Sequence, residues 1–398
     1  LLSFRRCLQS LTNWRTKSVR NWGRLGMKYN KFRFDEITLN YDKKRIPLSA
    51  MERTKRQGAF RYFGAQGVID YVDDYIFDGK YLLIAEDGEN LKSKRQNIAQ
   101  IVEGKFWVNN HAHIVQCNDK CILEYLAYLI NGKDVSGYIT GSAQPKLSQA
   151  NLNAMEFDIP SIKEQQDILS ILLPIEQKIR INKEINNNLE QQAKAIFSNE
   201  FLTLETLPDG WKQASLIDIA DYLNGLAMQK YRPTVDETGI PVLKIKELRQ
   251  GCCDDNSELC SPSIKSEYII HDGDVIFSWS GSLLVDFWCG GICGLNQHLF
   301  KVTSNKYNKW FYYAWTKHHL DRFIAVAADK ATTMGHIKRD ELSKAEVLIP
   351  NEADYKRIET LLQPIYDLII ANRIENKKLA ETRDTLLPKL MSGELDVS

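Results

Sequence analysis

Hydrophobic residues recur at alternating spacings of four and three in two long segments of the chain, residues 168–196 and 358–386. Such a narrow stripe is typical of the seam of a coiled coil, because residues three and four apart lie on one face of a helix. Pro174 and Pro364 interrupt the two segments. Because proline in a helix interior costs about 3 kcal/mol, the pattern predicts a short helix before each proline and a long helix beginning at it.

The two segments are copies of one another. Sliding the chain along itself by 190 residues, which brings Gln144 onto Met334, aligns residues 144–197 with 334–387. The aligned seams read Ile168, Leu172, Ile175, Ile179, Asn182, Asn186 and Leu189 in the first copy and Ile358, Leu362, Ile365, Ile369, Asn372, Asn376 and Leu379 in the second. Chance would produce only a few such coincidences, so we interpret the chain as a tandem duplication.

A pair of asparagines lies in the middle of each seam. Asparagine at a seam position costs stability but selects one register, because its amide needs a partner that only one alignment supplies. Two such seams can pair in either direction, and antiparallel pairing would relate the copies by an approximate two-fold axis. The alternative is that each helix covers the core of its own domain. A narrow stripe suits a partner helix better than a broad globular face, so we predict helix-on-helix pairing.

A mixed segment precedes each helical region. Short runs rich in Val, Ile, Phe and Tyr and punctuated by glycine predict strands at residues 67–71, 80–84, 106–108 and 274–279, and helices are expected at 121–130 and 307–323. The expected fold class is α+β, with two mixed α/β domains and two long helices. The predicted divisions are an atypical basic extension (1–26), module 1 (27–160), a helical spacer (161–205), module 2 (206–350) and a second helical spacer (351–398).

Composition narrows the classes of protein. The chain carries 52 Lys and Arg against 51 Asp and Glu, so it is not a protein with a simple basic tail, although basic residues can still gather on one face. Eight scattered cysteines in 398 residues favour a reducing compartment. No apolar run reaches the roughly 20 residues that span a bilayer, so we expect no membrane and a cytoplasmic location. Residues 1–26 are rich in arginine and contain no acid, and we expect the natural start near Met27, with a functional basic arm as the alternative.

Basic and glycine-rich stretches of both modules are the candidate DNA-binding regions, because Lys and Arg neutralise phosphates while Gln, Asn, Arg and His read base edges. In module 1 the candidates are Lys43, Lys44, Arg45, Arg53, Lys55, Arg56, Arg61, Tyr62 and Gln66, the last two in an expected loop at 62–67. Near the module ends they are Ser142, Gln144 and Lys146, and Lys330, Thr332, Thr333, His336, Lys338 and Arg339. A charge run alone is more often a solvated face, but two copies on a symmetric spacer favour DNA.

Catalytic and metal-binding motifs are missing from the sequence. We find no phosphate-binding loop, no dinucleotide fingerprint and no adenine-methyltransferase motif. Glu103-Gly-Lys105 imitates part of a nuclease site, a triplet that is frequent by chance. The cysteines at 117/121, 252/253/260 and 289/293 lack the spacing of a structural zinc site and are interpreted as free thiols. We therefore expect no catalytic residue, no metal and no cofactor in this chain.

The chain resembles the specificity subunit of type I restriction–modification systems from about residue 27 onward. The resemblance is carried by Tyr62-Phe-Gly-Ala-Gln-Gly67, Phe77-Asp-Gly-Lys-Tyr-Leu-Leu-Ile-Ala-Glu-Asp-Gly88, Gly141-Ser-Ala-Gln-Pro-Lys146, Ile159-Pro-Ser-Ile-Lys-Glu-Gln165 and Leu386-Leu-Pro-Lys-Leu-Met-Ser-Gly-Glu-Leu395. Module 2 carries a looser version of the glycine loops in residues 273–281, and Asn296 is taken to parallel Asn110. Residues 1–26 match no element of the family.

The resemblance implies two target-recognition domains, each reading one half of a split sequence in double-stranded DNA, held apart by two antiparallel helical regions. It implies two methyltransferase subunits that methylate adenine with S-adenosylmethionine, restriction/translocase subunits that use ATP and magnesium, and a bacterial or archaeal cytoplasm. Helix length would then set the half-site spacing. Two alternatives stay open: the DNA-reading part of a single-chain methyltransferase/nuclease relative, and a coiled-coil scaffold that does not bind DNA.

Overall fold

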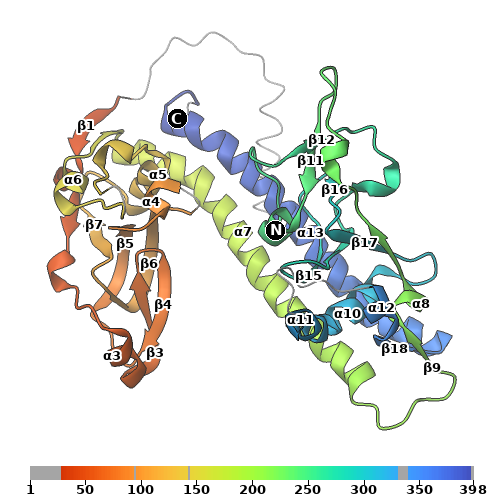
Figure 1. The fold of residues 1–398 in the computed structure, drawn as a ribbon. Coiled ribbons are helices and arrows are strands. Elements are labelled where there is room, and N and C mark those ends of the chain that lie inside the picture. Colours follow the sequence, from red (N-terminus) through yellow and green to blue (C-terminus); the bar gives the residue numbers. More distant parts are fainter. Residues whose placement is uncertain (1–27, 94–95, 142–143, 330–338, 396–398) are drawn as a thin grey trace. The chain divides into compact units, whose positions relative to one another are not determined.

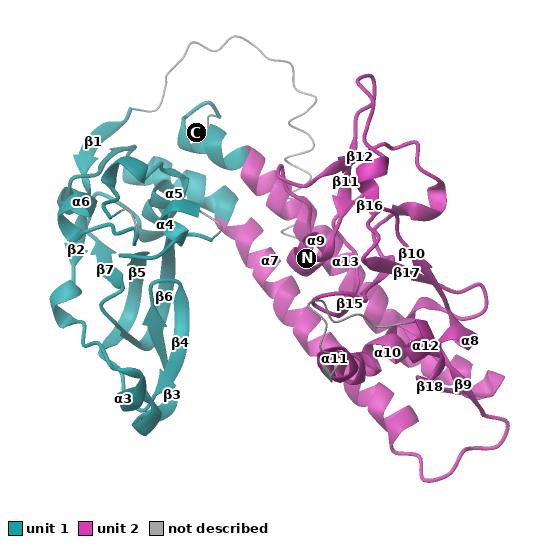
Figure 2. Cartoon of the chain, viewed as in Figure 1, with its two compact units in different colours: residues 1–172, 386–398 teal, residues 173–385 magenta. Residues whose placement is uncertain are grey.

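A computed structural model describes residues 28–93, 96–141, 144–329 and 339–395. Figure 1 shows its helices and strands. The chain divides into two compact units (Figure 2). Unit 1 comprises residues 1–172 and 386–398, and unit 2 comprises residues 173–385. Each unit therefore contains one mixed module together with parts of the two long helices.

Module 1 is built on one six-stranded sheet. Its strand order is β2 (Thr38–Asn40), β7 (Ala112–Cys117), β5 (Phe77–Ala85), β6 (Ala99–Val108), β3 (Gln57–Gly64) and β4 (Gly67–Val72), antiparallel except for the β3–β6 pair. A separate ribbon pairs β1 (Asn30–Arg33) with β8 (Glu156–Ile159). The helical elements are α2 (Phe34–Ile37), η1 (Asp42–Lys44), α3 (Ala50–Lys55), α4 (Asn90–Ser93), α5 (Leu123–Gly132), η2 (Ser136–Tyr138) and α6 (Gln149–Asn153).

Module 2 holds two four-stranded sheets. The first has the order β10 (Asp221–Asn224), β17 (Leu299–Thr303), β14 (Val275–Ser278), β15 (Leu284–Phe287), and the second β12 (Leu259–Cys260), β11 (Ile240–Leu243), β16 (Cys293–Leu295), β13 (Ile269–Ile270). A ribbon pairs β9 (Lys212–Ser215) with β18 (Glu346–Ile349). The helical elements are η3 (Ser198–Leu202), α8 (Leu216–Ile219), η4 (Met228–Lys230), α9 (Ile245–Gln250), η5 (Ser266–Tyr268), α10 (Lys309–His318), α11 (Leu320–Asp329) and α12 (Arg339–Ser343).

The two modules share a strand plan that is interrupted in module 2. Where β6 of module 1 is continuous, module 2 has β15 and β16 separated by residues 288–292. The buried Trp288 ring lies over the backbone there, and a Cβ on Gly290 would lie 2.2 Å from it. Its indole also donates a hydrogen bond to the carbonyl of Gly291 (2.6 Å). Only glycine lets the chain pass so close to a ring, so this turn accounts for the division into two sheets.

The predicted strands at 67–71, 80–84, 106–108 and 274–279 are confirmed, as is the helix near 121–130. The helix expected over 307–323 is wrong in detail, because α10 ends at His318 and α11 begins at Leu320. The loop expected at 62–67 is also wrong. Tyr62 lies within β3, which ends at Gly64. Gly67, at φ +127°, begins β4 after a two-residue turn. Buried aromatic residues suit a strand better than a loop.

The expected breaks at the two prolines are wrong. The helices α7 (Ile162–Phe197) and α13 (Glu352–Met391) run through Pro174 and Pro364 without interruption. Proline costs a helix about 3 kcal/mol, but full burial of one Leu or Ile side chain returns about 1.5–3 kcal/mol. Leu172 and Ile175 are buried on either side of Pro174. Burial on both sides thus offsets the lost backbone hydrogen bond.

The predicted antiparallel pairing of the two helices is confirmed within unit 2. Asn182 donates to the side chain of Asn376 (2.9 Å), and Asn372 donates to that of Asn186 (2.8 Å). Going from Asn182 to Asn186 along α7, the contacted residue on α13 moves back from Asn376 to Asn372. The two helices therefore run antiparallel. Because the repeat equates Asn182 with Asn372 and Asn186 with Asn376, the two contacts exchange under an approximate two-fold axis. Ion pairs from Lys178 to Glu375 (3.0 Å) and Glu190 to Arg373 (2.9 Å) extend this pairing.

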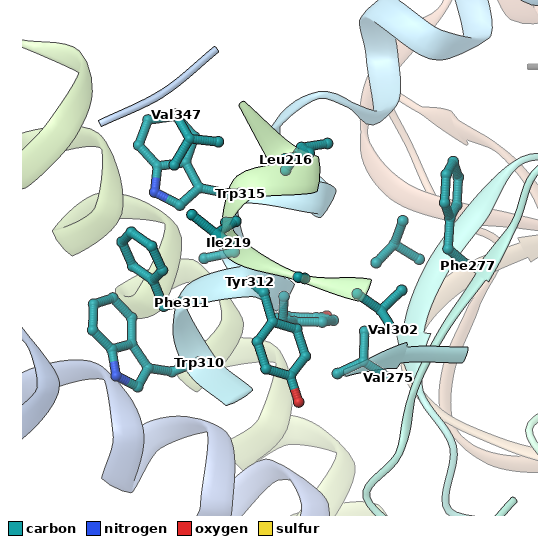
Figure 3. Packing of buried hydrophobic residues seen from close by; sticks show 14 of the residues in the cluster. Leu216, Ile219, Val275, Phe277, Val302, Trp310, Phe311, Tyr312, Trp315 and Val347 are labelled. Atoms are coloured by element: carbon teal, nitrogen blue, oxygen red, sulfur yellow. The ribbon is translucent and has the colours of Figure 1, made fainter. Parts of the chain in front are cut away.

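The helix-helix seam is shorter than expected, because its first positions lie in globular cores. Ile358 and Leu362 belong to the large core of module 2. Figure 3 shows Trp310 and Phe311 of the same core. Ile168 and Leu172 are likewise buried and belong to unit 1. Of the remaining seam residues, Ile175, Asn182, Asn186, Ile369, Asn372 and Leu379 are buried, whereas Ile179, Leu189, Ile365 and Asn376 are half-buried. Both interpretations of the stripe therefore hold, and they overlap at Ile369, which lies in the seam and in the core of module 2.

Each module begins against the end of a long helix. In unit 1 the Tyr29 hydroxyl donates to the carbonyl of Met391 in α13 (3.1 Å). In unit 2 the strand register makes Trp211 the equivalent of Tyr29, and the 190-residue repeat makes Phe201 the equivalent of Met391. The rings of Trp211 and Phe201 lie 5.6 Å apart. Aromatic side chains fill this junction in unit 2, whereas in unit 1 a pocket of about 560 Å³ remains beside Tyr29.

Candidate nucleic-acid interface

Loops that follow separate strands meet at one end of the module 1 sheet. The amide of Glu86, after β5, donates to the carbonyl of His111, after β6 (2.9 Å), and the amide of Gly88 donates to the carbonyl of Pro145 (3.1 Å). Asn109 connects to the end of β3 through its amide (3.0 Å to the Phe63 carbonyl). We call residues 65–66, 86–88, 109–111, 140–141 and 144–146 the reading loops of module 1. Backbone hydrogen bonds between loops hold their exposed side chains in a defined arrangement.

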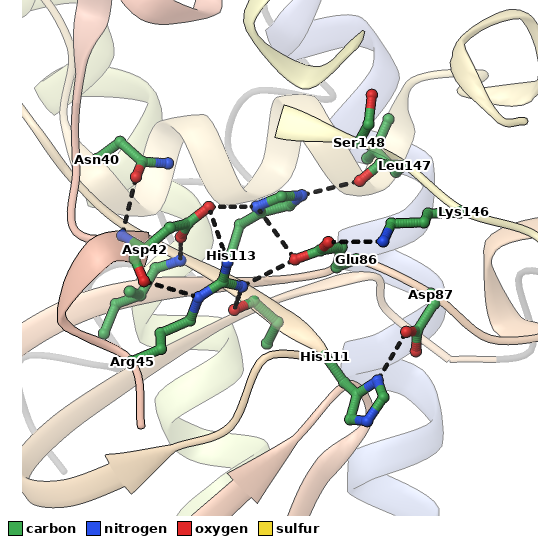
Figure 4. Close-up of polar contacts among 12 residues, drawn as sticks. Asn40, Asp42, Arg45, Glu86, Asp87, His111, His113, Lys146, Leu147 and Ser148 are labelled. Atoms are coloured by element: carbon green, nitrogen blue, oxygen red, sulfur yellow. Dashed lines mark hydrogen bonds and ion pairs between the residues drawn. The ribbon is translucent and has the colours of Figure 1, made fainter. Parts of the chain in front are cut away.

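An ionic cluster lies beneath the reading loops (Figure 4). His113, on β7, is buried, with Nδ1 2.6 Å from an oxygen of Asp42 and Nε2 2.8 Å from the carbonyl of Leu147. Arg45 donates to Glu86 (2.8 Å) and to the Ala112 carbonyl (2.7 Å). Lys146 reaches the other oxygen of Glu86 at 3.2 Å. The cluster thus connects η1, β5 and β7 with Lys146 and Leu147.

The carboxylates of this cluster stay ionised. Burial alone would raise the pKa of Asp42, but its hydrogen bond and charge interaction with His113, the Ile114 amide and Arg45 together hold the pKa below the ordinary value. Burial opposes ionisation of Glu86 in the same way, and Arg45, His113 and Lys146 lower its pKa. Since cations already contact both carboxylates, the cluster is an ion-paired network.

The arginines predicted to bind DNA are mostly held by acidic or carbonyl groups of module 1. Arg45 belongs to the cluster just described, Arg53 pairs with Asp70 (2.9 Å), and Arg56 pairs with Asp73 (2.9 Å). Arg61 donates to the carbonyl of Glu103. Their interactions stabilise the module and leave fewer donors for phosphates. Tyr62 has no exposed surface, and its hydroxyl accepts from the Leu48 amide, so we withdraw it as a DNA contact.

Several other candidates are exposed, namely Lys43, Lys44, Lys55, Gln66, Gln144, Lys146 and Arg339. Of these, Gln66, Gln144 and Lys146 lie in the reading loops, and Lys43 and Lys44 lie in η1, which Arg45 ties to the same end of the sheet. Arg339 begins α12 in module 2. Ser142, Lys330, Thr332, Thr333, His336 and Lys338, like the extension 1–26, lie outside the described residues.

Sequence reasoning missed His111 as a candidate, although the repeated Asn-x-His triplet could have found it. His111 is exposed, and its Nδ1 lies 2.6 Å from Asp87. The expected match of Asn110 to Asn296 is wrong by one residue. Asn109 and Asn296 are equivalent, since each follows the strand parallel to β3 or β11 and accepts a hydrogen bond from the amide two residues later.

Module 2 has a corresponding set of loops. The amide of Asn296 donates to the carbonyl of Leu243 (3.2 Å), as the amide of Asn109 does to that of Phe63 in module 1. The amide of Gln297 donates to the carbonyl of Leu226 (2.9 Å), and Trp279 donates to the Asn224 side chain (3.0 Å). The turns 224–226, 279–281 and 296–298 are therefore the described counterparts of η1 and the reading loops.

The ion pairs within the cluster oppose metal binding. Asp42, Glu86 and His113 are the one group of ligand-type side chains within 4.8 Å of one another in the described part of the chain. A metal would require a deprotonated ring nitrogen and would have to displace the guanidinium of Arg45. The seven cysteines in the described ranges are free thiols that form no disulfide. None of the described helices combines the length and hydropathy needed to cross a membrane.

Comparison with known proteins defines the family. The sequence profile of the type I restriction modification DNA specificity domain matches residues 27–191 and again residues 208–381. The chain belongs to this family. The two matches correspond to the two copies of the internal duplication. Each match covers one module and most of the helix that follows it. Because the two matches cover most of the chain, the expected family is confirmed.

Two specificity subunits and one crystal structure are similar to this chain over most of its length. It is similar to the type I restriction enzyme MjaIX specificity subunit of Methanocaldococcus jannaschii, with 28% identity over 70% of each chain. The HindI specificity subunit of Haemophilus influenzae is 20% identical over 80% of this chain and 84% of its own. The fold is similar to the crystal structure of the type I restriction–modification S subunit from M. genitalium, with a TM-score of 0.64 and 12% identity over 93% of this chain and 98% of that one. The α+β architecture with long helices is thus that of the family.

Proposed function

We propose that this chain is the DNA sequence-specificity subunit of a type I restriction–modification complex. Each module reads one half of a bipartite site in double-stranded DNA and so directs adenine methylation and restriction to it. The observation that carries the proposal is the double match to the specificity-domain family, one match for each module. The arrangement of the reading loops supports it, because they present exposed Gln, Asn, His and Lys side chains together. Such groups can donate to and accept from base edges and phosphates.

The partner subunits that we propose are two methyltransferase subunits and a restriction/translocase subunit. An exposed apolar stripe on each long helix supports docking of the former. Leu361, Pro364 and Leu368 lie three and four residues apart on α13, and Ile181 and Ile185 lie four residues apart on α7. Contiguous exposed apolar groups are typical of interaction surfaces. Both long helices therefore offer exposed apolar groups to a partner subunit, at positions that the repeat does not equate.

We propose that the partner subunits carry out the methylation and restriction reactions. S-adenosylmethionine, ATP and magnesium would be bound by them, and this chain would contribute recognition alone. The sequence supports this division, since it lacks the motifs of methyltransferases and nucleotide-binding proteins. The two long helices would then set the spacing between the half-sites, because the asparagine contacts fix their register.

The test is long-read sequencing of adenine methylation in cells that carry the complete system, with and without this chain. We expect one bipartite motif that is methylated only when the chain is present. A motif that persists without the chain would contradict the proposal. As a matched test of the catalytic alternative, the purified chain alone should transfer no methyl group to DNA. The variant Glu103→Gln should leave the motif and restriction unchanged, since Glu103 lies on β6 outside the reading loops.

A further inference from the structure

An Asn-x-His triplet follows equivalent strands of the two modules, as Asn109-Asn-His111 and as Asn296-Gln-His298. In each copy the backbone amide of the histidine donates to the side-chain oxygen of the asparagine, over 2.8 Å in module 1 and 3.2 Å in module 2. Both asparagines are buried. The turn therefore holds the backbone of the histidine in the same way in both copies.

In module 1 the ring of His111 is oriented by Asp87. Its Nδ1 lies 2.6 Å from a carboxylate oxygen of Asp87 (Figure 4). The backbones of the two loops are also joined, because the amide of Glu86 donates to the carbonyl of His111 (2.9 Å). The side chain of Asp87 is 17% exposed, whereas that of His111 is 47% exposed. A mostly buried carboxylate thus holds a ring that remains open to solvent.

The contact with Asp87 determines what the second ring nitrogen of His111 offers. A carboxylate can only accept, so the hydrogen of this contact is on Nδ1. A neutral imidazole with its hydrogen on Nδ1 presents Nε2 as an acceptor, on another side of the ring. None of the described residues forms a hydrogen bond with Nε2. The ring therefore presents an acceptor of fixed orientation among the reading loops.

The counterpart in module 2 is arranged differently. The register of β5 against β7, and of β14 against β17, makes Ser280 the counterpart of Asp87. Ser280 is buried and carries no charge. The ring of His298 lies against that of Trp279, with 6.2 Å between centroids, and its Nδ1 is buried without a hydrogen-bond partner among the described residues. The same turn thus orients a ring by a carboxylate in module 1 and packs a ring on an indole in module 2.

We infer that His111 is a specificity-determining residue of module 1, whose Nε2 accepts a hydrogen bond from the amino group of one base, and that Asp87 is its positioning residue. The inference rests on the proposed function and names the chemical group that this turn reads. The amino groups of adenine and cytosine are the donors that the major groove presents to such an acceptor. Loss of one base contact corresponds to about a tenfold loss of discrimination.

The experiment uses the assembled complex with its methyltransferase subunits. Methylation rates are measured on the cognate duplex and on duplexes in which one adenine or cytosine lacks its amino group, with the adenines that are methylated left intact. In the wild type we expect deletion at one position of one half-site to slow methylation about tenfold. In His111→Ala the cognate duplex should react about tenfold more slowly, and the same deletion should cost nothing further, because the contact is already absent.

Two variants of Asp87 test the positioning role. Asp87→Ala removes the acceptor for Nδ1 and should make methylation less sensitive to the same deletion. Asp87→Asn keeps a side-chain oxygen that can accept and should restore most of the wild-type sensitivity. His271→Ala, at an exposed histidine outside the turns of module 2, is the matched control and should behave as the wild type does. His111→Phe, which keeps a ring without nitrogen, serves as a second variant if H111A does not assemble.

The outcomes separate the inference from the function on which it rests. If H111A or H111F is as sensitive to the amino-group deletion as the wild type, His111 does not read that group, and a uniform loss of rate on all duplexes would indicate a phosphate contact instead. Either result would overturn the inference, as would a D87N variant as impaired as D87A. A wild-type complex that methylates cognate duplexes and duplexes with substituted half-sites equally would contradict the proposed function.

Discussion

In module 1 the corner between β2, β5 and β7 is built from Asp42, Glu86 and His113, whereas the equivalent corner of module 2 contains Asn224, Trp279 and Phe300. One backbone bond is nevertheless kept, because the amides of Asn109 and Asn296 donate to carbonyls at the ends of β3 and β11. A buried backbone group must be paired in either copy, which favours keeping such a bond after duplication. The side chains were free to diverge, which suits two modules that read different sequences.

The two helix junctions differ in the same way. Trp211 and Phe201 pack with Phe197 and Trp315 in unit 2, with centroids 5.0–5.6 Å apart. In unit 1 the smaller Met391 meets Tyr29 beside an open pocket. Equal topology therefore does not mean equal stability, since the buried aromatic area differs between the copies.

The largest expected effect comes from truncating the junctions. Trp211→Ala should destabilise unit 2 by about 3–5 kcal/mol, because it removes a buried ring and leaves a cavity, and it also leaves Asp354 without the indole donor (2.9 Å). Tyr29→Ala should cost only about 1 kcal/mol, the value of one hydrogen bond. Hydrogen exchange of the β9 and β1 amides measures the two local free energies. Equal losses in the two variants would contradict the asymmetry.

An intermediate effect is expected at Arg373, which joins three elements of unit 2. Its guanidinium binds Asp286 on β15 (2.6 Å) and Glu190 on α7 (2.9 Å), and despite burial these charges raise its pKa. Arg373→Gln should cost about 1.5–3 kcal/mol through lost charged hydrogen bonds, measured by the urea midpoint. The repeat equivalent Lys183 is exposed, so Lys183→Gln is the matched control. A midpoint unchanged in R373Q would show that this contact does not hold the module to the helices.

The smallest effect concerns acid stability of module 1. A carboxyl whose pKa is lowered by folding stabilises the protein above its ordinary pKa of about 4, and the contribution is lost as the pH falls from there through the folded pKa. Asp42→Asn should therefore lose roughly 1 kcal/mol at pH 7 and lose less on acidification than the wild type. Urea midpoints between pH 3 and 7 measure this. Asn224→Asp, at the exposed module 2 counterpart, should leave the acid profile unchanged, and a steeper D42N profile would contradict the assignment.

Much of the fold could be predicted from the sequence. The 190-residue repeat, the asparagine-marked seam and the strand plan of the modules depend on local periodicity and on self-comparison, both of which are visible in one chain. The proline breaks were wrong because the local cost of Pro174 is opposed by burial of Leu172 and Ile175, which the pattern does not measure. Propensity was overruled there by tertiary packing.

The candidate site was harder to predict. Arg45 looked like a free cation, but its partner Glu86 lies 41 residues away, and the Asp42–His113 contact spans 71 residues. Tyr62 looked like a loop residue because glycines surround it, yet it is buried. Whether a basic residue is available to DNA depends on which distant carboxylate folds against it, and composition carries no information about that distance.

The sequence by itself determined that there are two copies of one plan, a central asparagine register and no catalytic motif, since each is written in residues close together or at a constant offset. Only the tertiary structure decided which strands end at the same corner, which cations are already paired there and which side chains remain exposed. The physical reason is that hydrogen bonds and ion pairs are short-ranged, so their partners are chosen by the folded backbone and not by neighbourhood in the chain.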